Sequence, residues 1–345
     1  MSALDRPLRA VTVPSLPLES GEVLSDVAVA YHRDGPADAP VVVVIHALTG
    51  HADAVGDWWR LVAGPGRALD TTRVQVIAPN LLGSCYGSSG PATWPVAFPA
   101  VTPRDQARAI WGLLDTLGIG AAALVTGGSL GGMVALEVAA LAPERVGHVA
   151  ALAAPAAHTA WAIGFNHAQR VALDALGGGK AGLALARRIA MLSYRAEPGL
   201  EHRFGRTTEA EGAWRIAGWL DAHGEKLVAR FDAASYRLLL DAMDAHDLGR
   251  GRASVAAALA PLDGRVTGIG ISSDVLYSAD LVRYWTELAG GRYESLVSPH
   301  GHDAFLIDQH HVGRLLQRPL AEGLAWLSGR AAATAPTPVR PEVAA

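Results

Sequence analysis

The chain has 345 residues, half of them hydrophobic and 18% charged, which is enough to bury a large core and excludes a disordered or fibrous protein. Its net charge is −4, and its lysines and arginines are scattered instead of forming a basic stripe, so we expect no nucleic acid among its partners. Cys85 is the only cysteine and the N-terminal stretch lacks the apolar segment of a secretory signal, so we expect a cytoplasmic protein without disulfides.

Short β-branched segments alternate with helical stretches in the first half of the chain. Strands that are buried on both faces are predicted at Val41–Ile45, Val74–Ala78, Ala122–Thr126 and Val146–Leu152. A helix is predicted to follow the N-cap Thr102 and to run to Leu117, since proline at the first helical position is favourable. This alternation is typical of an α/β fold with a mostly parallel, doubly wound sheet.

The second half begins with a long helical region. Strand signals are missing between residues 156 and 260, and helical periodicity is clear at Ala181–Leu192 and Ser235–Ala245. Strands are predicted again at Val266–Ser272 and Tyr293–Ser298, with helices at Ala279–Ala289 and after Val312. We therefore expect the first part of the core at 1–155, a helical lid at 156–260, the second part of the core at 261–329 and a disordered tail at 330–345. No segment is apolar over the length of about 20 residues that a membrane-spanning helix needs, so we expect no membrane partner.

The segment from Thr126 to Gly132 has the G-x-S-x-G pattern, with Ser129 at its centre. It follows a predicted strand and leads into the apolar helix Met133–Leu141, which is the context of a nucleophile elbow in α/β-hydrolase folds. Gly127 and Gly131 remove side chains that would collide in such a sharp turn. We interpret Ser129 as a nucleophile; the alternative is a glycine-rich phosphate-binding turn with an incidental serine.

A serine nucleophile requires a histidine base and a carboxylate that orients it. In α/β hydrolases these follow the serine in the order acid, then histidine, on loops after the last strands. Asp274 comes just after the strand Val266–Ser272, and His302 lies in the loop after Tyr293–Ser298. We assign Asp274 and His302 to these roles and prefer His302 over His300, because Gly301 allows a tight turn in front of it.

Two backbone N–H groups usually bind the oxyanion of acyl transfer. The residue after the nucleophile, Leu130, supplies one of them, and Leu48, in the loop after Val41–Ile45, is the candidate for the other. We expect His46 in the same loop to be structural. No residue spacing indicates a metal site, and we expect no permanently bound cofactor.

From about Ala30 to Asp308 the chain resembles the homoserine O-acyltransferase family, which includes homoserine O-acetyltransferases. The stretches that carry the resemblance are HALTG (46–50), WWRLVAGPGRALDT (58–71), PNLLGSCYGSSGP (79–91), GGSLGGM (127–133), LARRIAMLSYR (185–195), RFDAASY (230–236) and GHDAFLID (301–308). The resemblance implies a ping-pong transfer of an acetyl group from acetyl-CoA, through an acyl-serine, to the hydroxyl of homoserine in methionine biosynthesis. It also implies a homodimer formed through the lids.

The resemblance further implies that Arg187 binds the carboxylate of the amino acid and that Asp303 binds its amine. An arginine fork matches a carboxylate, and an aspartate can pair with an ammonium. The adjacent Arg188 is an alternative to Arg187. Departures from the family pattern lie mostly in the lid, so succinyl-CoA as donor and serine as acceptor stay open. An esterase or thioesterase with water as acceptor is a further alternative.

Overall fold

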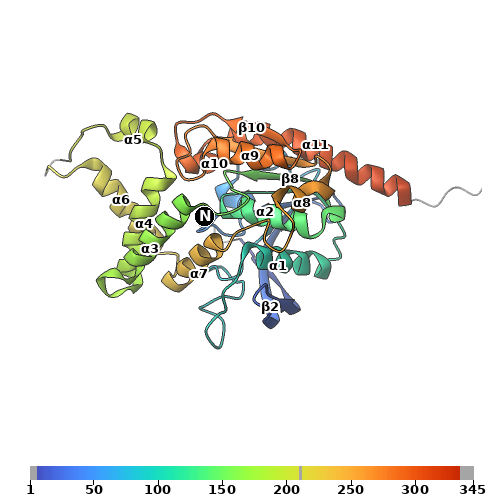
Figure 1. Cartoon of the computed structure of the whole chain (residues 1–345), viewed down its shortest axis with the longest axis horizontal. Coiled ribbons are helices and arrows are strands. Elements are labelled where there is room, and N and C mark those ends of the chain that lie inside the picture. Colours follow the sequence, from blue (N-terminus) through green and yellow to red (C-terminus); the bar gives the residue numbers. More distant parts are fainter. Residues whose placement is uncertain (1–5, 210–211, 335–345) are drawn as a thin grey trace, which may run out of the picture.

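An eight-stranded sheet with the strand order β1-β2-β6-β3-β7-β8-β9-β10 forms the centre of the protein (Figure 1). The structure is a computed structural model and describes residues 6–209 and 212–334. The ten strands are β1 (Arg9–Pro17), β2 (Val23–Asp34), β3 (Val41–Ile45), β4 (Ala63–Gly64), β5 (Leu69–Asp70), β6 (Gln75–Pro79), β7 (Ala122–Gly128), β8 (Val146–Leu152), β9 (Val266–Ile271) and β10 (Arg292–Leu296). Strands β4 and β5 pair separately. From β6 to β10 all neighbours in the main sheet are parallel, while β1 and β2 are antiparallel.

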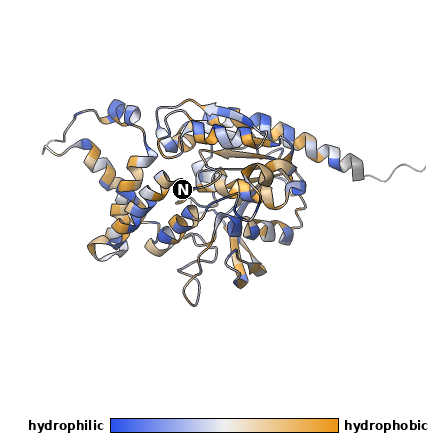
Figure 2. Cartoon of the chain, in the orientation of Figure 1, coloured by the Kyte–Doolittle hydropathy of each residue, from blue (hydrophilic) through white to orange (hydrophobic). Residues whose placement is uncertain are grey.

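Helices cover both faces of this sheet. Alternate residues of a strand contribute to different hydrophobic clusters. Val43 packs on the side of helices α1 (Pro103–Thr116), α2 (Leu130–Leu141) and α9 (Ala279–Leu288), whereas Val44 packs on the side of α11 (Gln309–Thr334). Every residue of β3, β7, β8 and β9 is buried, which is why these strands are continuous apolar runs rather than alternating ones. Figure 2 shows the resulting hydrophobic centre between more polar helices. The predicted α/β-hydrolase fold class is thereby confirmed.

Between β8 and β9 the chain leaves the sheet and forms a group of helices on one side of the core, which we call the cap (Figure 1). The helices of the cap are α3 (Ala160–Asp174), α4 (Gly179–Tyr194), α5 (Glu197–Phe204), α6 (Arg215–Val228) and α7 (Ala233–Asp244). The core helices are α1 (Pro103–Thr116), α2 (Leu130–Leu141), α8 (Val255–Leu259), α9 (Ala279–Leu288), α10 (Ala304–Ile307) and α11 (Gln309–Thr334). Short turns of other helix types lie at Ala54–Trp58, Pro143–Arg145, Ala175–Gly177, Ala260–Leu262 and Gly301–Asp303.

Most predicted strands appear within two residues of their predicted bounds, and Val41–Ile45 and Val146–Leu152 match residue for residue. Three features differ from expectation: the strand pair β1 and β2, the position of α8 and the end of α11. The antiparallel pair β1 and β2 was not predicted, because prolines interrupt β1; an edge strand tolerates them. Helix α8 falls within the range 156–260 expected for the lid, but it packs against α2 and α9 of the core.

The tail was expected to be disordered from residue 330, but α11 continues to Thr334. This segment has no apolar periodicity, but its alanines are good helix formers and extend the preceding helix. Residues 335–345 of the expected tail lie outside the described residues. Among the helices of the described ranges, none has the length and hydropathy needed to cross a bilayer.

Candidate active site

Ser129 lies at the turn between β7 and α2, at the carboxyl edge of the sheet. Its backbone angles of φ 56° and ψ −127° are rare for a residue with a side chain. A Cβ atom on Gly127 would lie 2.5 Å from the carbonyl oxygen of Ile45, and one on Gly131 would overlap the same oxygen. Glycine at both positions therefore lets β3, β7 and α2 meet closely enough to form the sharp turn.

Asp274 and His302 lie in contact at the same edge, after β9 and β10. The Nδ1 atom of His302 lies 2.7 Å from Oδ2 of Asp274, and both side chains are buried. The other carboxylate oxygen, Oδ1, accepts the backbone N–H groups of Leu276 at 2.8 Å and Tyr277 at 3.0 Å. Burial alone would disfavour a charged imidazole, but the Asp274 carboxylate outweighs it and raises the pKa of His302 above its ordinary value.

The Nε2 atom of His302 faces the cavity that contains Ser129. Both residues line a small cavity of about 50 Å³, and Nε2 is buried without a hydrogen-bond partner among the described residues. Ser129 and His302 do not form a hydrogen bond in this structure; catalytic contacts are often longer before substrate binds. His300 is half-buried and does not line the cavity, so the geometry favours His302 over it.

The loop after β3 borders the cavity next to Ser129. His46 fixes this loop: its Nδ1 donates to the carbonyl of Ala47 at 2.7 Å, and its Nε2 accepts the N–H of Leu81 at 3.0 Å. Burial lowers the pKa of His46 to about 4, so the ring is neutral and structural. Leu48 and Ser129 line the same cavity, and in the described chain the N–H groups of Leu48 and Leu130 have no acceptor. These groups are available for an oxyanion.

Arg187 and Asp303 both line the cavity, the first from α4 of the cap and the second from the loop that carries His302. Burial raises the pKa of Asp303 above its ordinary value, and the charge of Arg187 opposes that rise. An incoming ammonium would favour the ionised carboxylate. Arg188 instead pairs with Asp221 at 2.8 Å and is absent from the cavity lining, which favours Arg187 of the two.

Sequence reasoning missed two neighbours of this charged pair, Tyr194 and Arg195. Tyr194 lines the cavity, with its ring centroid 5.7 Å from that of His302 and 5.4 Å from Cζ of Arg187. The Nη1 atom of Arg195 lies 3.7 Å from Oδ2 of Asp303. The spacing from Arg187 to Tyr194 is seven residues, which places both on one face of a helix, and this signal was present in the sequence.

Comparison with known proteins connects this geometry to a family. A family model described as the alpha/beta hydrolase fold matches residues 40–188. Homoserine O-acetyltransferase from Thermus thermophilus is 45% identical, over 80% of this chain and 80% of its own length. The chain belongs to the homoserine O-acetyltransferase family. The corresponding protein of Clavibacter michiganensis is 40% identical over 90% of this chain and 91% of its own. The predicted family is confirmed, and with it an enzyme of the acyltransferase class.

Solved structures agree with this family and fold. Homoserine O-acetyltransferase from Staphylococcus aureus is 30% identical and superimposes with a TM-score of 0.79, covering 90% of this chain and 94% of its own. The acetyl esterase MekB has a TM-score of 0.80 at 22% identity, covering 92% of this chain and 97% of its own, which shows the shared fold only. Within residues 6–209 and 212–334, no group of three His, Cys, Asp or Glu side chains is arranged to hold a metal ion.

Proposed function

We propose that this acyltransferase moves an acetyl group from acetyl-CoA to the side-chain hydroxyl of L-homoserine through an acyl-serine on Ser129. The observation that carries the proposal is the placement of Ser129, the His302–Asp274 pair and the oppositely charged Arg187 and Asp303 around one small cavity. The names of the relatives support homoserine as the acceptor.

The first half of the reaction forms the acyl-enzyme. Ser129 Oγ attacks the thioester carbon while His302 Nε2 takes its proton, and Asp274 stabilises the imidazolium that results. The N–H groups of Leu48 and Leu130 bind the oxyanion. The C–S bond then breaks, and the proton passes from His302 to the sulfur. Free CoA leaves before the acceptor binds, which makes the kinetics ping-pong.

The second half transfers the acyl group to the amino acid. Arg187 holds its carboxylate and Asp303 its ammonium, which aims the side-chain hydroxyl at the acyl carbon. His302 takes the hydroxyl proton as the new ester bond forms, and it returns this proton to Ser129 Oγ as the bond between Oγ and the acyl carbon breaks. The cavity itself, about 50 Å³, leaves little room for water beside a bound acceptor, which limits hydrolysis of the acyl-enzyme. The same small size favours an acetyl over a succinyl group.

The test follows the release of free thiol from acetyl-CoA or succinyl-CoA, with homoserine, serine or no acceptor present. We expect release to depend on homoserine and to be fastest with acetyl-CoA, and Ser129→Ala to abolish it. Rapid release without any amino acid would indicate a thioesterase and reject the proposal. Faster release with succinyl-CoA or with serine would replace the donor or the acceptor named here.

Arg187 and Arg188 form a matched pair of test positions for the acceptor. Arg187→Leu should raise the KM for homoserine by about 10- to 100-fold, because a charge-assisted hydrogen bond is lost. Arg188→Leu removes only a partly exposed ion pair with Asp221 and should change this KM by less than about twofold. Equal effects of the two substitutions would contradict the assignment of the carboxylate site to Arg187.

We place the reaction in the cytoplasm, as a step of methionine biosynthesis. The relatives are named homoserine O-acetyltransferases, so the expected product is O-acetylhomoserine. Its acetate is a good leaving group that a sulfur nucleophile can displace, which suits a step toward a sulfur-containing amino acid. The single cysteine and the absence of disulfides suit a reducing compartment. Acetyl-CoA is then a co-substrate, and we propose no permanently bound cofactor.

A further inference from the structure

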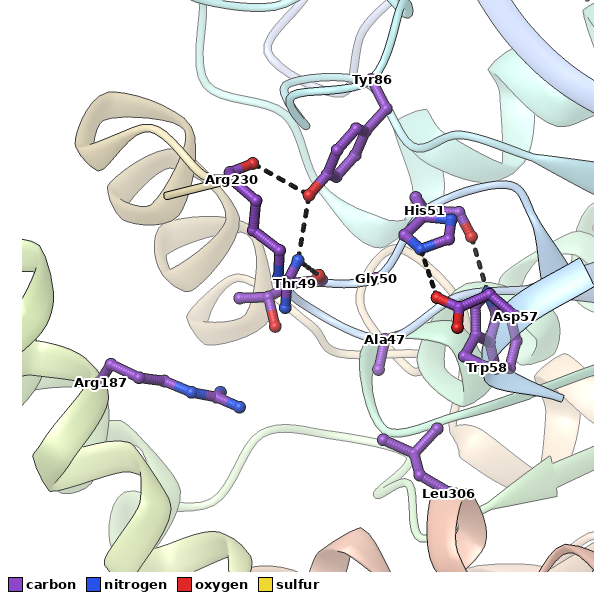
Figure 3. A pocket seen from close by; sticks show the side chains of 10 residues that line it. All are labelled: Ala47, Thr49, Gly50, His51, Asp57, Trp58, Tyr86, Arg187, Arg230 and Leu306. Atoms are coloured by element: carbon purple, nitrogen blue, oxygen red, sulfur yellow. Dashed lines mark hydrogen bonds and ion pairs between the residues drawn. The ribbon is translucent and has the colours of Figure 1, made fainter. Parts of the chain in front are cut away.

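A larger hollow of about 350 Å³ adjoins the cavity of Ser129 (Figure 3). The two spaces share four lining residues, which are Ala47, Thr49, Arg187 and Leu306. A molecule in the larger hollow can therefore extend into the smaller one. Neither the triad nor the residues proposed for the amino acid account for the other polar groups that line this hollow.

One wall of the hollow is formed by Arg230 and Tyr86. Nη1 of Arg230 donates to the carbonyl of Thr49 at 2.6 Å and to the hydroxyl of Tyr86 at 3.0 Å, and this hydroxyl donates back to the carbonyl of Arg230 at 2.9 Å. Figure 3 shows these bonds together. The Nη2 and Nε atoms of Arg230 have no acceptor within the described chain, so they remain free to donate to a ligand.

His51 and Asp57, which also line the hollow, add an acceptor. Asp53 donates its backbone N–H to Nδ1 of His51 at 3.2 Å, so Nε2 carries the ring proton and donates to Oδ2 of Asp57 at 3.0 Å. Burial lowers the pKa of His51, which keeps the ring neutral. Asp57 belongs to the single π-helical turn Ala54–Trp58, an element that is rare and often found at functional sites. Half of its side chain is exposed, so oxygen lone pairs are available to a ligand.

We propose that this hollow binds the neutral, amide-bearing pantetheine arm of the acyl donor, and that this arm, not the nucleotide at its far end, carries donor recognition. The proposal rests on the proposed function, since the donor must be a thioester that reaches Ser129. A secondary amide needs a donor for its carbonyl and an acceptor for its N–H. Arg230 and Asp57, which both line the hollow, supply these two groups.

The position of the hollow separates the arm from the nucleotide. Arg230 bonds to Thr49, the residue next to Leu48 of the candidate oxyanion site, and consecutive Cα atoms are only about 3.8 Å apart. Arg230 therefore lies near the reacting carbon. There the donor carries its amides, whereas its diphosphate is a whole pantetheine chain away. A diphosphate in the hollow would also meet the carboxylate of Asp57.

The chemistry is unchanged when the nucleotide is removed. The Ser129 Oγ–carbon bond forms, the carbon–sulfur bond breaks, and the serine proton passes through His302 to the sulfur, so the leaving group is a free thiol. Acetyl-CoA and S-acetylpantetheine present the same thioester and the same arm. They differ only in groups that lie beyond the hollow.

The experiment compares three acyl donors by the rate of homoserine acetylation with the whole protein. They are acetyl-CoA, which has the arm and the nucleotide, S-acetylpantetheine, which has the arm alone, and p-nitrophenyl acetate, which has neither. We expect kcat/KM for S-acetylpantetheine to lie within about tenfold of that for acetyl-CoA. A larger loss would assign recognition to the nucleotide and overturn the proposal.

Asp57→Ala tests the hollow itself. Loss of a charged acceptor should lower kcat/KM about tenfold for acetyl-CoA and S-acetylpantetheine alike, and leave p-nitrophenyl acetate unchanged. Asp280→Ala is the matched control, because Asp280 is an exposed helical aspartate paired with Arg283 and lies outside the hollow. No effect of Asp57→Ala on either thioester, or an effect on all three donors, overturns the proposal. If wild-type protein releases no homoserine-dependent thiol from acetyl-CoA, the proposed function itself has failed.

Discussion

Each oxygen of the Asp274 carboxylate has a separate structural role. Oδ1 accepts two backbone N–H groups of its own loop, which fixes the carboxylate in place, and Oδ2 holds Nδ1 of His302. Within the described residues the ring has a hydrogen-bond partner on Nδ1 and none on Nε2, so the tautomer with its lone pair on Nε2 is favoured. This is the form that can accept a proton from Ser129, and it depends on a single carboxylate.

The pH dependence of the first half-reaction should report on this pair. His302 must be neutral to act as a base, and Asp274 raises its pKa, so activity should already fall at a pH above the ordinary histidine value of about 6.5. Asp274→Asn removes the charge and should move this acid limb to lower pH while lowering kcat by about 10³- to 10⁴-fold. The measurement is kcat/KM for acetyl-CoA against pH.

The control for this prediction is Asp263→Asn, which changes an exposed aspartate and keeps a residue type that tolerates its left-handed backbone, with φ 48°. Its pH profile should match that of the wild type. A wild-type acid limb below pH 6.5, or one that Asp274→Asn leaves in place, would contradict the role assigned to the carboxylate.

How far single residues can be predicted depends on what determines their position. Ser129, Asp274 and His302 follow strands whose buried apolar runs are easy to recognise, and parallel strands bring their carboxyl ends to one edge. The choice between Arg187 and Arg188 depends on how α4 is rotated against the core, which a local pattern does not specify. Tyr194 was overlooked for the same reason, although its spacing from Arg187 was visible.

At the scale of elements, the cap is bonded to the loop that carries the catalytic carboxylate. His158, just before α3, has its Nε2 atom 2.7 Å from the hydroxyl of Tyr277, and Trp161 in α3 donates its indole N–H to the carbonyl of Val275 at 2.7 Å. Nδ1 of His158 lies 3.0 Å from Asp244 at the end of α7. The ring of Tyr277 also packs edge-on against His302. Two cap helices are thus connected to the acid and the base.

Tyr277→Phe should weaken this connection without removing the ring that packs on His302. The buried Nε2 of His158 loses its partner, at a cost of about 1–3 kcal/mol, and the loop of Asp274 becomes less restrained. We expect a lower melting temperature and a several-fold lower kcat, with the KM for homoserine nearly unchanged. Because a merely structural role would leave the chemistry of the folded enzyme intact, the decisive readout is kcat at a temperature well below unfolding.

Tyr284→Phe is the matched control for that substitution, since Tyr284 lies on α9 with 64% of its surface exposed. It should leave both kcat and the melting temperature unchanged. A normal kcat in Tyr277→Phe, at a temperature where the protein is folded, would show that the connection stabilises the fold without positioning the acid.

Elements differ in how well sequence patterns predict them. The central strands are specified by burial on both faces. The start of α1 is specified by a complete capping box between Thr102 and Asp105, with Pro103 at the first helical position. The pair β1–β2 lies at the edge of the sheet, where one-sided burial and prolines make the pattern weak. The assignment of α8 to the core follows from long-range packing against α2 and α9, which periodicity does not reveal.

At the scale of the whole molecule, residues of both the sheet-based core and the helical cap line the candidate active site. Figure 1 shows the cap on one side of the core. The core supplies the proposed nucleophile, base and acid, and the cap supplies Arg187 and Tyr194. Arg230, which follows α6 in the chain, is hydrogen-bonded to the loop that contains Leu48. In the same way, His158 and Trp161 are hydrogen-bonded to the loop that contains Asp274. The cap therefore contacts the site on two sides, and its position determines the shape of the cavity.

The cap carries apolar side chains that the monomer leaves exposed. They are Trp161, Val171, Leu176, Leu192 and Trp214, between 46% and 72% exposed. Leu176 also has φ 54° and ψ 29°, a left-handed conformation that costs about 1–3 kcal/mol for a bulky residue. A partner that packs on these side chains would bury apolar surface, and at Leu176 this burial would offset the cost of the backbone conformation. We expect a homodimer formed through the caps, as the family resemblance implies.

Leu176→Asn tests this assembly without changing the backbone requirement, because asparagine tolerates the left-handed region that leucine occupies at a cost. In a monomer the substitution should be neutral or stabilising. In a dimer through the cap it removes an apolar contact and should raise the dimer dissociation constant by about tenfold or more. Sedimentation equilibrium over a range of concentrations measures the difference.

Val23→Asn serves as control, since Val23 on β2 is 57% exposed but lies outside the cap, and it should leave the dimer dissociation constant unchanged. A wild-type protein that is monomeric at every concentration, or a dimer that Leu176→Asn does not weaken, would contradict this arrangement.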